Sequence, residues 1–110
     1  GLAFDRIALP ADAPGPYLLK FSLQSRAGGQ GEVYFTTDAA TILPRGSHQT
    51  FDVKHDGRWH DHSLKLTSQE VMHALRLDPC DQPGLIRLRN LRLIHSNGHV
   101  LIRWPPVNQP

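Results

Sequence analysis

The sequence has little of several features that would narrow its function. It holds one cysteine among 110 residues, Cys80, which excludes an internal disulfide and gives no zinc-binding pattern. No apolar run approaches the ~20 residues that a membrane-spanning helix needs, and no signal peptide is recognisable. We therefore expect no membrane span in this segment. Because a lone cysteine agrees with a reducing compartment, we expect a cytoplasmic rather than a periplasmic location.

The excess of one sign of charge is also small. Twelve Lys and Arg stand against ten Asp and Glu, a formal net charge of +2 at pH 7. Nucleic-acid binding depends on clustered phosphate contacts rather than on a slight excess of bases, so we expect no nucleic-acid partner. The last third of the chain is nevertheless locally basic, because its only acidic residues from 76 to 103 are Asp78 and Asp81. The arginines in that range are Arg76, Arg87, Arg89, Arg92 and Arg103.

A catalytic signature is missing as well. The sequence shows no nucleophile beside a base, no paired carboxylates and no phosphate-binding glycine loop. The stretch "AGGQGE" is rich in glycine but precedes a strand pattern, so it lacks the helix N-terminus that makes such loops bind phosphate. We therefore expect this domain not to be an enzyme.

What the sequence does have is hydrophobic alternation with period two. In segment 17–25 the residues Tyr17, Leu19, Phe21 and Leu23 share one face. Similar strand patterns occupy 31–38, 50–56, 59–66, 74–78, 85–94 and 99–104, separated by Gly, Pro, Asn and Asp clusters that supply turn geometry. Seven or eight short strands at such spacing indicate an all-β sandwich or barrel. We expect two packed antiparallel sheets with less than about a fifth of the residues helical.

Two local irregularities carry further expectations. In "LIRLRNLRLI", Ile86 and Leu88 keep one parity whereas Leu91 and Leu93 keep the other, which predicts a β-bulge near Arg89 and Asn90. The stretch "TSQEVMHAL" is the one segment that could be helical, and we expect at most one turn there.

The chain is short enough for one domain. We expect residues 1–104 to form a single β-sandwich domain and residues 105–110, "PPVNQP", to begin a Pro-rich linker. The first residue is not Met, and the chain closes on this Pro-rich stretch, so we expect a segment of a longer protein.

The order "DGRWHDHSLKL" followed by "ALRLDPCDQPGLIRLRNLRL" resembles the second half of galactose-binding-like β-sandwich (jelly-roll) domains. Such domains are attached to bacterial carbohydrate-active proteins, and the "DPxDxPG" turn is most like those attached to glycosyltransferases. The resemblance covers roughly residues 30–95, and His62 departs from it by standing where an aromatic ring is common.

The resemblance implies a jelly roll of about eight strands and a non-catalytic role. The domain would be a carbohydrate-binding or accessory module of a larger enzyme, a glycosyltransferase that builds polysaccharide. Its partner would be a glycan or the catalytic domain of the same chain. The alternative is a structural or protein-protein docking domain with no glycan binding of its own.

The candidate ligand-binding side chains are arginines and tryptophans. Alternating arginines are most simply the solvent face of a strand, but guanidinium forks also bind phosphate, sulfated or acidic sugars, or an acidic neighbouring domain. A tryptophan ring either stacks on a sugar or fills the core. The candidates are Arg87, Arg89, Arg92, Trp59 and Trp104.

Metal binding has a weaker basis in the sequence. Asp78 and Asp81 belong to "DPCDQPG", whose residues suit a tight turn. They offer two ligands where calcium takes six or more, so we expect a structural turn and no cofactor, with a structural calcium ion as the alternative. His60 and His62 project to one side of a strand, but a zinc site needs a third and a fourth ligand that the sequence does not place.

Overall fold

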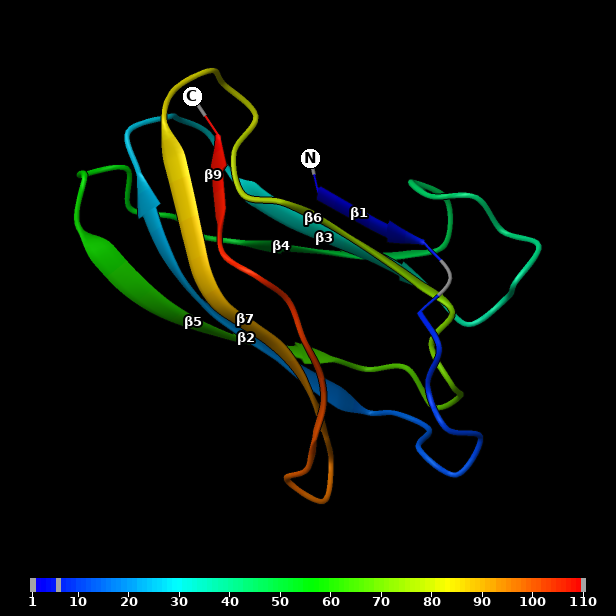
Figure 1. Ribbon diagram of the computed structural model, residues 1–110. Coiled ribbons are helices and arrows are strands. Elements are labelled where there is room, and N and C mark those ends of the chain that lie inside the picture. The colour runs from blue at the N-terminus through cyan, green and yellow to red at the C-terminus, as the bar shows by residue number, and fades with distance from the viewer. Residues whose placement is uncertain (1, 6, 110) are drawn as a thin grey trace.

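The protein is a β-sandwich, described here from a computed structural model that covers residues 2–5 and 7–109 (Figure 1). Two antiparallel sheets pack together, and no residue in these ranges is helical, so the predicted all-β sandwich is confirmed. No helix in the described part could span a membrane. The strands are β1 (Leu2–Asp5), β2 (Tyr17–Ser25), β3 (Gly31–Thr36), β4 (Ser47–Phe51), β5 (Trp59–Leu66), β6 (Ala74–Asp78), β7 (Ile86–His95), β8 (Val100–Arg103) and β9 (Val107–Gln109).

The strand order follows a nested pairing. Sheet I has the order β1-β6-β3-β4 and sheet II the order β5-β2-β7-β8. Because β8 pairs with one end of β7 and β9 with the other, these two short strands fill one strand position, which gives the expected eight. The pairs β3–β4, β2–β5 and β1–β6 lie one inside the next, which is the pairing of a rolled-up hairpin and the pattern of a jelly roll.

The core lies between the sheets and consists of the alternating apolar side chains. The four inward residues of β2 are each at most 1% exposed. They pack into one cluster with the inward residues of sheet I, Val33, Leu75 and Leu77 among them. Since side chains alternate along a strand, the intervening residues of β2 point away from the core. The inward residues of β2 are Tyr17, Leu19, Phe21 and Leu23.

The predicted β-bulge is confirmed in β7. Between the pairs Lys20↔Arg92 and Ser22↔Arg89, one residue of β2 faces two residues of β7. The extra residue is accommodated at Asn90, whose φ is 57°. This is a left-handed conformation that asparagine tolerates better than most residues. The bulge keeps leucines inward on both sides of it, and so leaves the arginines of β7 on the outer face.

The sequence pattern misplaced some strand ends. Segment 50–56 was expected to be a strand, but β4 ends at Phe51, and Val53 packs against the core from the following loop. Residues 107–109, within the Pro-rich stretch, form β9 and pair with 86–88. Segment 67–73 is an irregular connection, in which the Ser68 hydroxyl donates to the Glu70 carbonyl at 2.8 Å.

The β2–β3, β4–β5 and β6–β7 loops meet at one end of the sandwich, the upper left in Figure 1. The carbonyl of Gly28 accepts hydrogen bonds from the backbone N–H groups of Asp81 and Gln82 at 3.1 and 3.2 Å. The N–H of Gly57 donates to the Ser25 carbonyl at 2.8 Å. The "DPCDQPG" segment is therefore a turn that the β2–β3 loop holds in place.

Candidate functional site

The outer face of sheet II gathers positive side chains from four strands. Residues paired across antiparallel strands project to the same side, so Lys20 of β2 stands beside Arg92 of β7, and Arg92 beside Arg103 of β8. We call this surface the basic face. Its charged side chains are Lys20, Asp61, Lys65, Arg87, Arg89, Arg92 and Arg103.

The charge on this face is far from balanced. It bears six of the chain's twelve Lys and Arg but only one of its ten Asp and Glu, Asp61. The Asp61 carboxylate accepts a hydrogen bond from the Ser22 hydroxyl at 2.5 Å. Among the described residues, the ion pairs are His60 with Asp56 and Arg76 with Asp78, so the face's cations pair with no carboxylate. The small net charge of the chain conceals this segregation.

The outer face of β3, β4 and β6 in sheet I is different, because charged groups there satisfy one another. Arg76 Nε lies 3.1 Å from Asp78 Oδ1. The Tyr34 ring lies between the Arg76 guanidinium, 5.8 Å from the ring centroid, and the His48 ring, 5.2 Å away and nearly parallel. The Tyr34 hydroxyl donates to the Glu32 carboxylate, and this hydrogen bond raises the pKa of Tyr34. A charged ligand thus finds fewer open groups here.

Trp59 lies on the basic face, where its ring contacts an arginine. The Arg89 guanidinium carbon is 3.9 Å from the centre of the Trp59 ring, within cation–π distance. The stack fixes the position of the guanidinium and covers one side of the ring that would otherwise be open to a sugar. Trp59 and Arg89 were both candidate binding residues, and the structure places them in contact. The Trp59 ring holds the Arg89 guanidinium in position.

Trp104 is not part of this face. Its backbone N–H donates to the Leu91 carbonyl at 3.0 Å, and its partly buried ring packs against the core. The Trp104 ring therefore lies on the core side of sheet II, away from the basic face. Arg87 and Arg92 both lie on the basic face, on either side of Arg89, at positions set by their pairing with Gln24 and Lys20.

A hollow of about 320 Å³ opens on the basic face at the β-bulge. The Arg92 guanidinium is anchored at its edge, because Nη1 donates to the Asn90 carbonyl at 2.7 Å. We call this cavity the bulge hollow. The outward side chains that line it are Lys20, Ser22, Asp61, Ser63, Asn90 and Arg92.

The residues considered for metal binding are engaged otherwise. Among the residues that the structure describes, no three His, Cys, Asp or Glu side chains form a group that could hold a metal ion. Asp78 pairs with Arg76, whereas Asp81 is exposed in the turn. His60 Nε2 contacts the two carboxylate oxygens of Asp56 at 2.9 and 3.0 Å.

His62 packs in the sandwich as an aromatic residue would. Its ring stacks on Phe21 at 5.0 Å and meets the edge of Phe51 at 5.5 Å, and its Nε2 is buried without a hydrogen-bond partner. Burial lowers the pKa of His62 below its ordinary value of 6.5, and the nearby His60 adds to this effect.

Replacing His62 by phenylalanine should make stability less dependent on pH. Because the pKa of His62 is lower in the folded chain, the unfolded chain binds this proton more readily, and stability should fall as the pH drops below 6.5. His62→Phe keeps the stacked ring and removes the titration. Its melting temperature should fall less than that of the wild type between about pH 7 and pH 5. His99→Asn, a change at an exposed histidine, should keep the wild-type dependence; equal slopes in all three proteins would contradict this account.

A serine and a histidine form a hydrogen-bonded pair that the sequence did not suggest. Ser25 Oγ lies 2.6 Å from His55 Nδ1, and His55 Nε2 lies 2.7 Å from the Gly29 carbonyl. This carbonyl can only accept, so Nε2 carries a proton, and in the neutral ring Nδ1 then accepts from the serine. Ser25 is fully buried, and its oxygen also accepts the N–H of Ala27 at 3.1 Å. In this conformation the buried hydroxyl is out of reach of a substrate. The pair holds the β4–β5 loop against the end of β2 and the β2–β3 loop.

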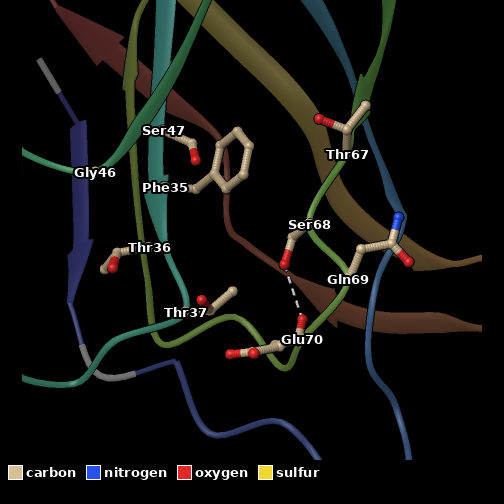
Figure 2. A pocket seen from close by; sticks show the side chains of 9 residues that line it. All are labelled: Phe35, Thr36, Thr37, Gly46, Ser47, Thr67, Ser68, Gln69 and Glu70. Carbon is tan, nitrogen blue, oxygen red and sulfur yellow. Dashed lines mark hydrogen bonds between the residues drawn. The ribbon is translucent and has the colours of Figure 1, made fainter.

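A second cavity lies at the edge of the sandwich, between the end of the β3–β4 hairpin and the connection from β5 to β6 (Figure 2). It has a volume of about 470 Å³ and a lining rich in hydroxyl groups. The hydroxyls of Thr36 and Ser68 bond to nearby backbone groups, and Phe35 is only 3% exposed. Glu70 is the one charged side chain in its lining. This hydroxyl-lined cleft could accept a small neutral ligand but offers little to an anion.

The geometry thus defines an antiparallel β-sandwich with a strongly basic sheet face. Comparison with protein-family models, curated proteins and solved structures finds no significant match to this chain. The sequence reasoning missed Lys20, Asp61 and Arg103 as neighbours of the β7 arginines. The alternation in "YLLKFSLQS" does place Lys20 on the outer face. The strand register that brings Lys20 beside Arg92 cannot be read from the sequence.

Proposed function

We propose that this domain is a non-catalytic binding module that holds an acidic glycan on the basic face, as part of a larger carbohydrate-active enzyme. One observation carries the proposal: six cations and one carboxylate share a single sheet face, with no ion pair among the described residues to neutralise them. Arginine recognises carboxylate and ester oxyanions through paired hydrogen bonds, so this face suits an anionic ligand.

The shape of the face favours a chain-like ligand. Arg87 and Arg92 are five residues apart, about 17 Å along β7, and four strands span about 14 Å across the sheet. The surface is therefore extended, and its charges lie in rows. The resemblance to accessory domains of polysaccharide-building glycosyltransferases supports a glycan as this ligand.

A nucleic acid fits the face less well. Proteins that bind single strands combine positive charge with exposed rings on which bases stack. The tryptophan on this face has the Arg89 guanidinium stacked against it, and Trp104 packs against the core. An acidic polysaccharide needs no such stacking platform.

The experiment is a titration of the 110-residue domain with polygalacturonate, dextran sulfate, neutral dextran and a single-stranded oligonucleotide. We expect the two acidic polysaccharides to bind and to be released by added salt. Salt weakens attraction between exposed charges, and at 0.1 M it screens charges that are more than ~10 Å apart. Neutral dextran should bind at best in the millimolar range, about 4 kcal/mol. Tighter binding of dextran or of the oligonucleotide would contradict the proposal.

The docking alternative uses the same face. Titration with one further ligand, poly-glutamate, distinguishes it from glycan binding. If the basic face meets an acidic surface of a neighbouring domain, poly-glutamate should bind with similar salt dependence while acidic polysaccharides do not. That outcome would replace the glycan by a protein partner.

A further inference from the structure

We propose that the bulge hollow binds the phosphate monoester group of a phosphorylated sugar, which makes it a specific subsite of the basic face. This inference rests on the proposed function and deepens it by naming the anionic group.

The cations around the hollow suit a group with more than one negative charge. Lys20 and Arg92 line the hollow, and Arg103 is the cross-strand neighbour of Arg92 on the next strand, so three adjacent strands each bring one cation to one row. A phosphate monoester carries about −1.5 to −2 at pH 7 and three acceptor oxygens. A carboxylate carries a single charge on two oxygens, and it would leave most of this row uncompensated.

The row is unfavourable without a ligand. Like charges that lie directly opposite each other on neighbouring strands destabilise a sheet. Arg92 has such a neighbour on both sides, and its guanidinium is still held in place by the Asn90 carbonyl at 2.7 Å. A bound dianion would relieve this repulsion, so the ligand should also stabilise the fold.

The other groups in the hollow fit the sugar part. Ser63 and Asn90 present a hydroxyl and an amide to the hollow, and both are exposed. Asp61 would repel a bare anion, but its carboxylate can accept a hydrogen bond from a sugar hydroxyl, as it does from Ser22. The hollow thus pairs an anion-binding side with an acceptor for hydroxyl groups, which matches a sugar phosphate better than an inorganic ion.

The test is an amide NMR titration with glucose 6-phosphate, glucuronate and inorganic phosphate at equal ionic strength. Glucose 6-phosphate should saturate and shift the amides of Lys20, Asn90 and Arg92, with glucuronate at least 5-fold weaker and inorganic phosphate in between. Lys20→Met, which keeps the aliphatic stem, should weaken glucose 6-phosphate about 10-fold, the effect of one charge-assisted hydrogen bond. The matched control Arg45→Met removes a charge from the exposed connection between β3 and β4, away from the basic face, and should change affinity less than 2-fold.

The outcomes separate this inference from the proposed function. If glucuronate binds as well as glucose 6-phosphate, or if the two methionine variants lose equal affinity, the hollow is not a phosphate subsite. If acidic polysaccharides bind to the domain and glucose 6-phosphate does not saturate, the subsite inference fails while the proposed function stands. If glucose 6-phosphate binds in the hollow and no acidic polysaccharide binds, the subsite stands and the glycan function fails.

Discussion

Replacing Arg87, Arg89 and Arg92 together by glutamine should lower the affinity for an acidic polysaccharide about 100-fold. Each arginine is on the basic face without an ion pair among the described residues, so each is free to meet an anionic group of the ligand. Three partly exposed charge pairs of about 1 kcal/mol each add up to roughly that factor. Fluorescence or calorimetric titration at about 0.1 M salt measures the loss.

The control for this triple variant is Arg45→Gln. Arg45 is exposed in the connection between β3 and β4, away from the basic face, and the change removes one charge of the same kind. It should leave affinity within about 2-fold, because exposed charges more than ~10 Å from a ligand are screened. The melting temperature of the triple variant shows whether it still folds, because the variant also loses the stack of Arg89 on Trp59 and the hydrogen bond from Arg92 to the Asn90 carbonyl. An unchanged affinity in the triple variant would refute the role of the β7 arginines.

Replacing Gly84 by alanine should destabilise the fold by about 2–3 kcal/mol. Gly84 has φ of 151°, and an added Cβ would lie 2.5 Å from the Cα of Ala27 and 2.6 Å from the Arg26 carbonyl oxygen. These are backbone atoms of a strand end held by the Arg26 to Leu85 hydrogen bond at 2.9 Å, so they cannot move aside. Chemical denaturation measures the loss, and the fraction that still folds should bind ligand normally.

Gly98 provides the matched control for this substitution. It also has positive φ, 92°, but an added Cβ would meet no atom within 4 Å. Gly98→Ala should therefore show only the backbone strain, about 1 kcal/mol. If the two alanine variants lost equal stability, the close approach of the two loops at Gly84 would not be what the glycine is needed for.

Local patterns in the sequence were sufficient for several parts of the fold. Alternation in "YLLKFSLQS", "WHDHSLKL" and "ALRLD" predicted β2, β5 and β6 with their bounds, because a half-buried strand shows period two directly. The change of parity between Leu88 and Leu91 likewise revealed the bulge, since both leucines must face the core.

Other parts depend on pairing between distant segments. The Phe51 and Val53 alternation suggested a longer strand than β4, yet Val53 packs on the core from a loop, which period two cannot distinguish from a strand. Prolines in the last six residues hid the pairing of Val107 with Leu88.

The candidate site was predictable only in part for the same reason. The arginines of β7 were visible as a row, but their contacts depend on register. Trp59 stands at Arg89 because both strands pair with β2, and this puts residues 30 positions apart within 3.9 Å. The net charge of +2 averages over the whole chain and therefore gave no sign that cations collect on one face.

The most direct test of the basic face is an amide NMR titration of the domain with an acidic oligosaccharide. The account predicts that the largest shift changes map to the outer positions of β2, β5, β7 and β8, around Lys20, Arg89 and Arg92, and disappear in the triple glutamine variant. Shift changes that cluster instead around Thr37, Ser47 and Thr67, in the hydroxyl-lined cleft of Figure 2, would contradict it and move the binding site to the edge of the sandwich.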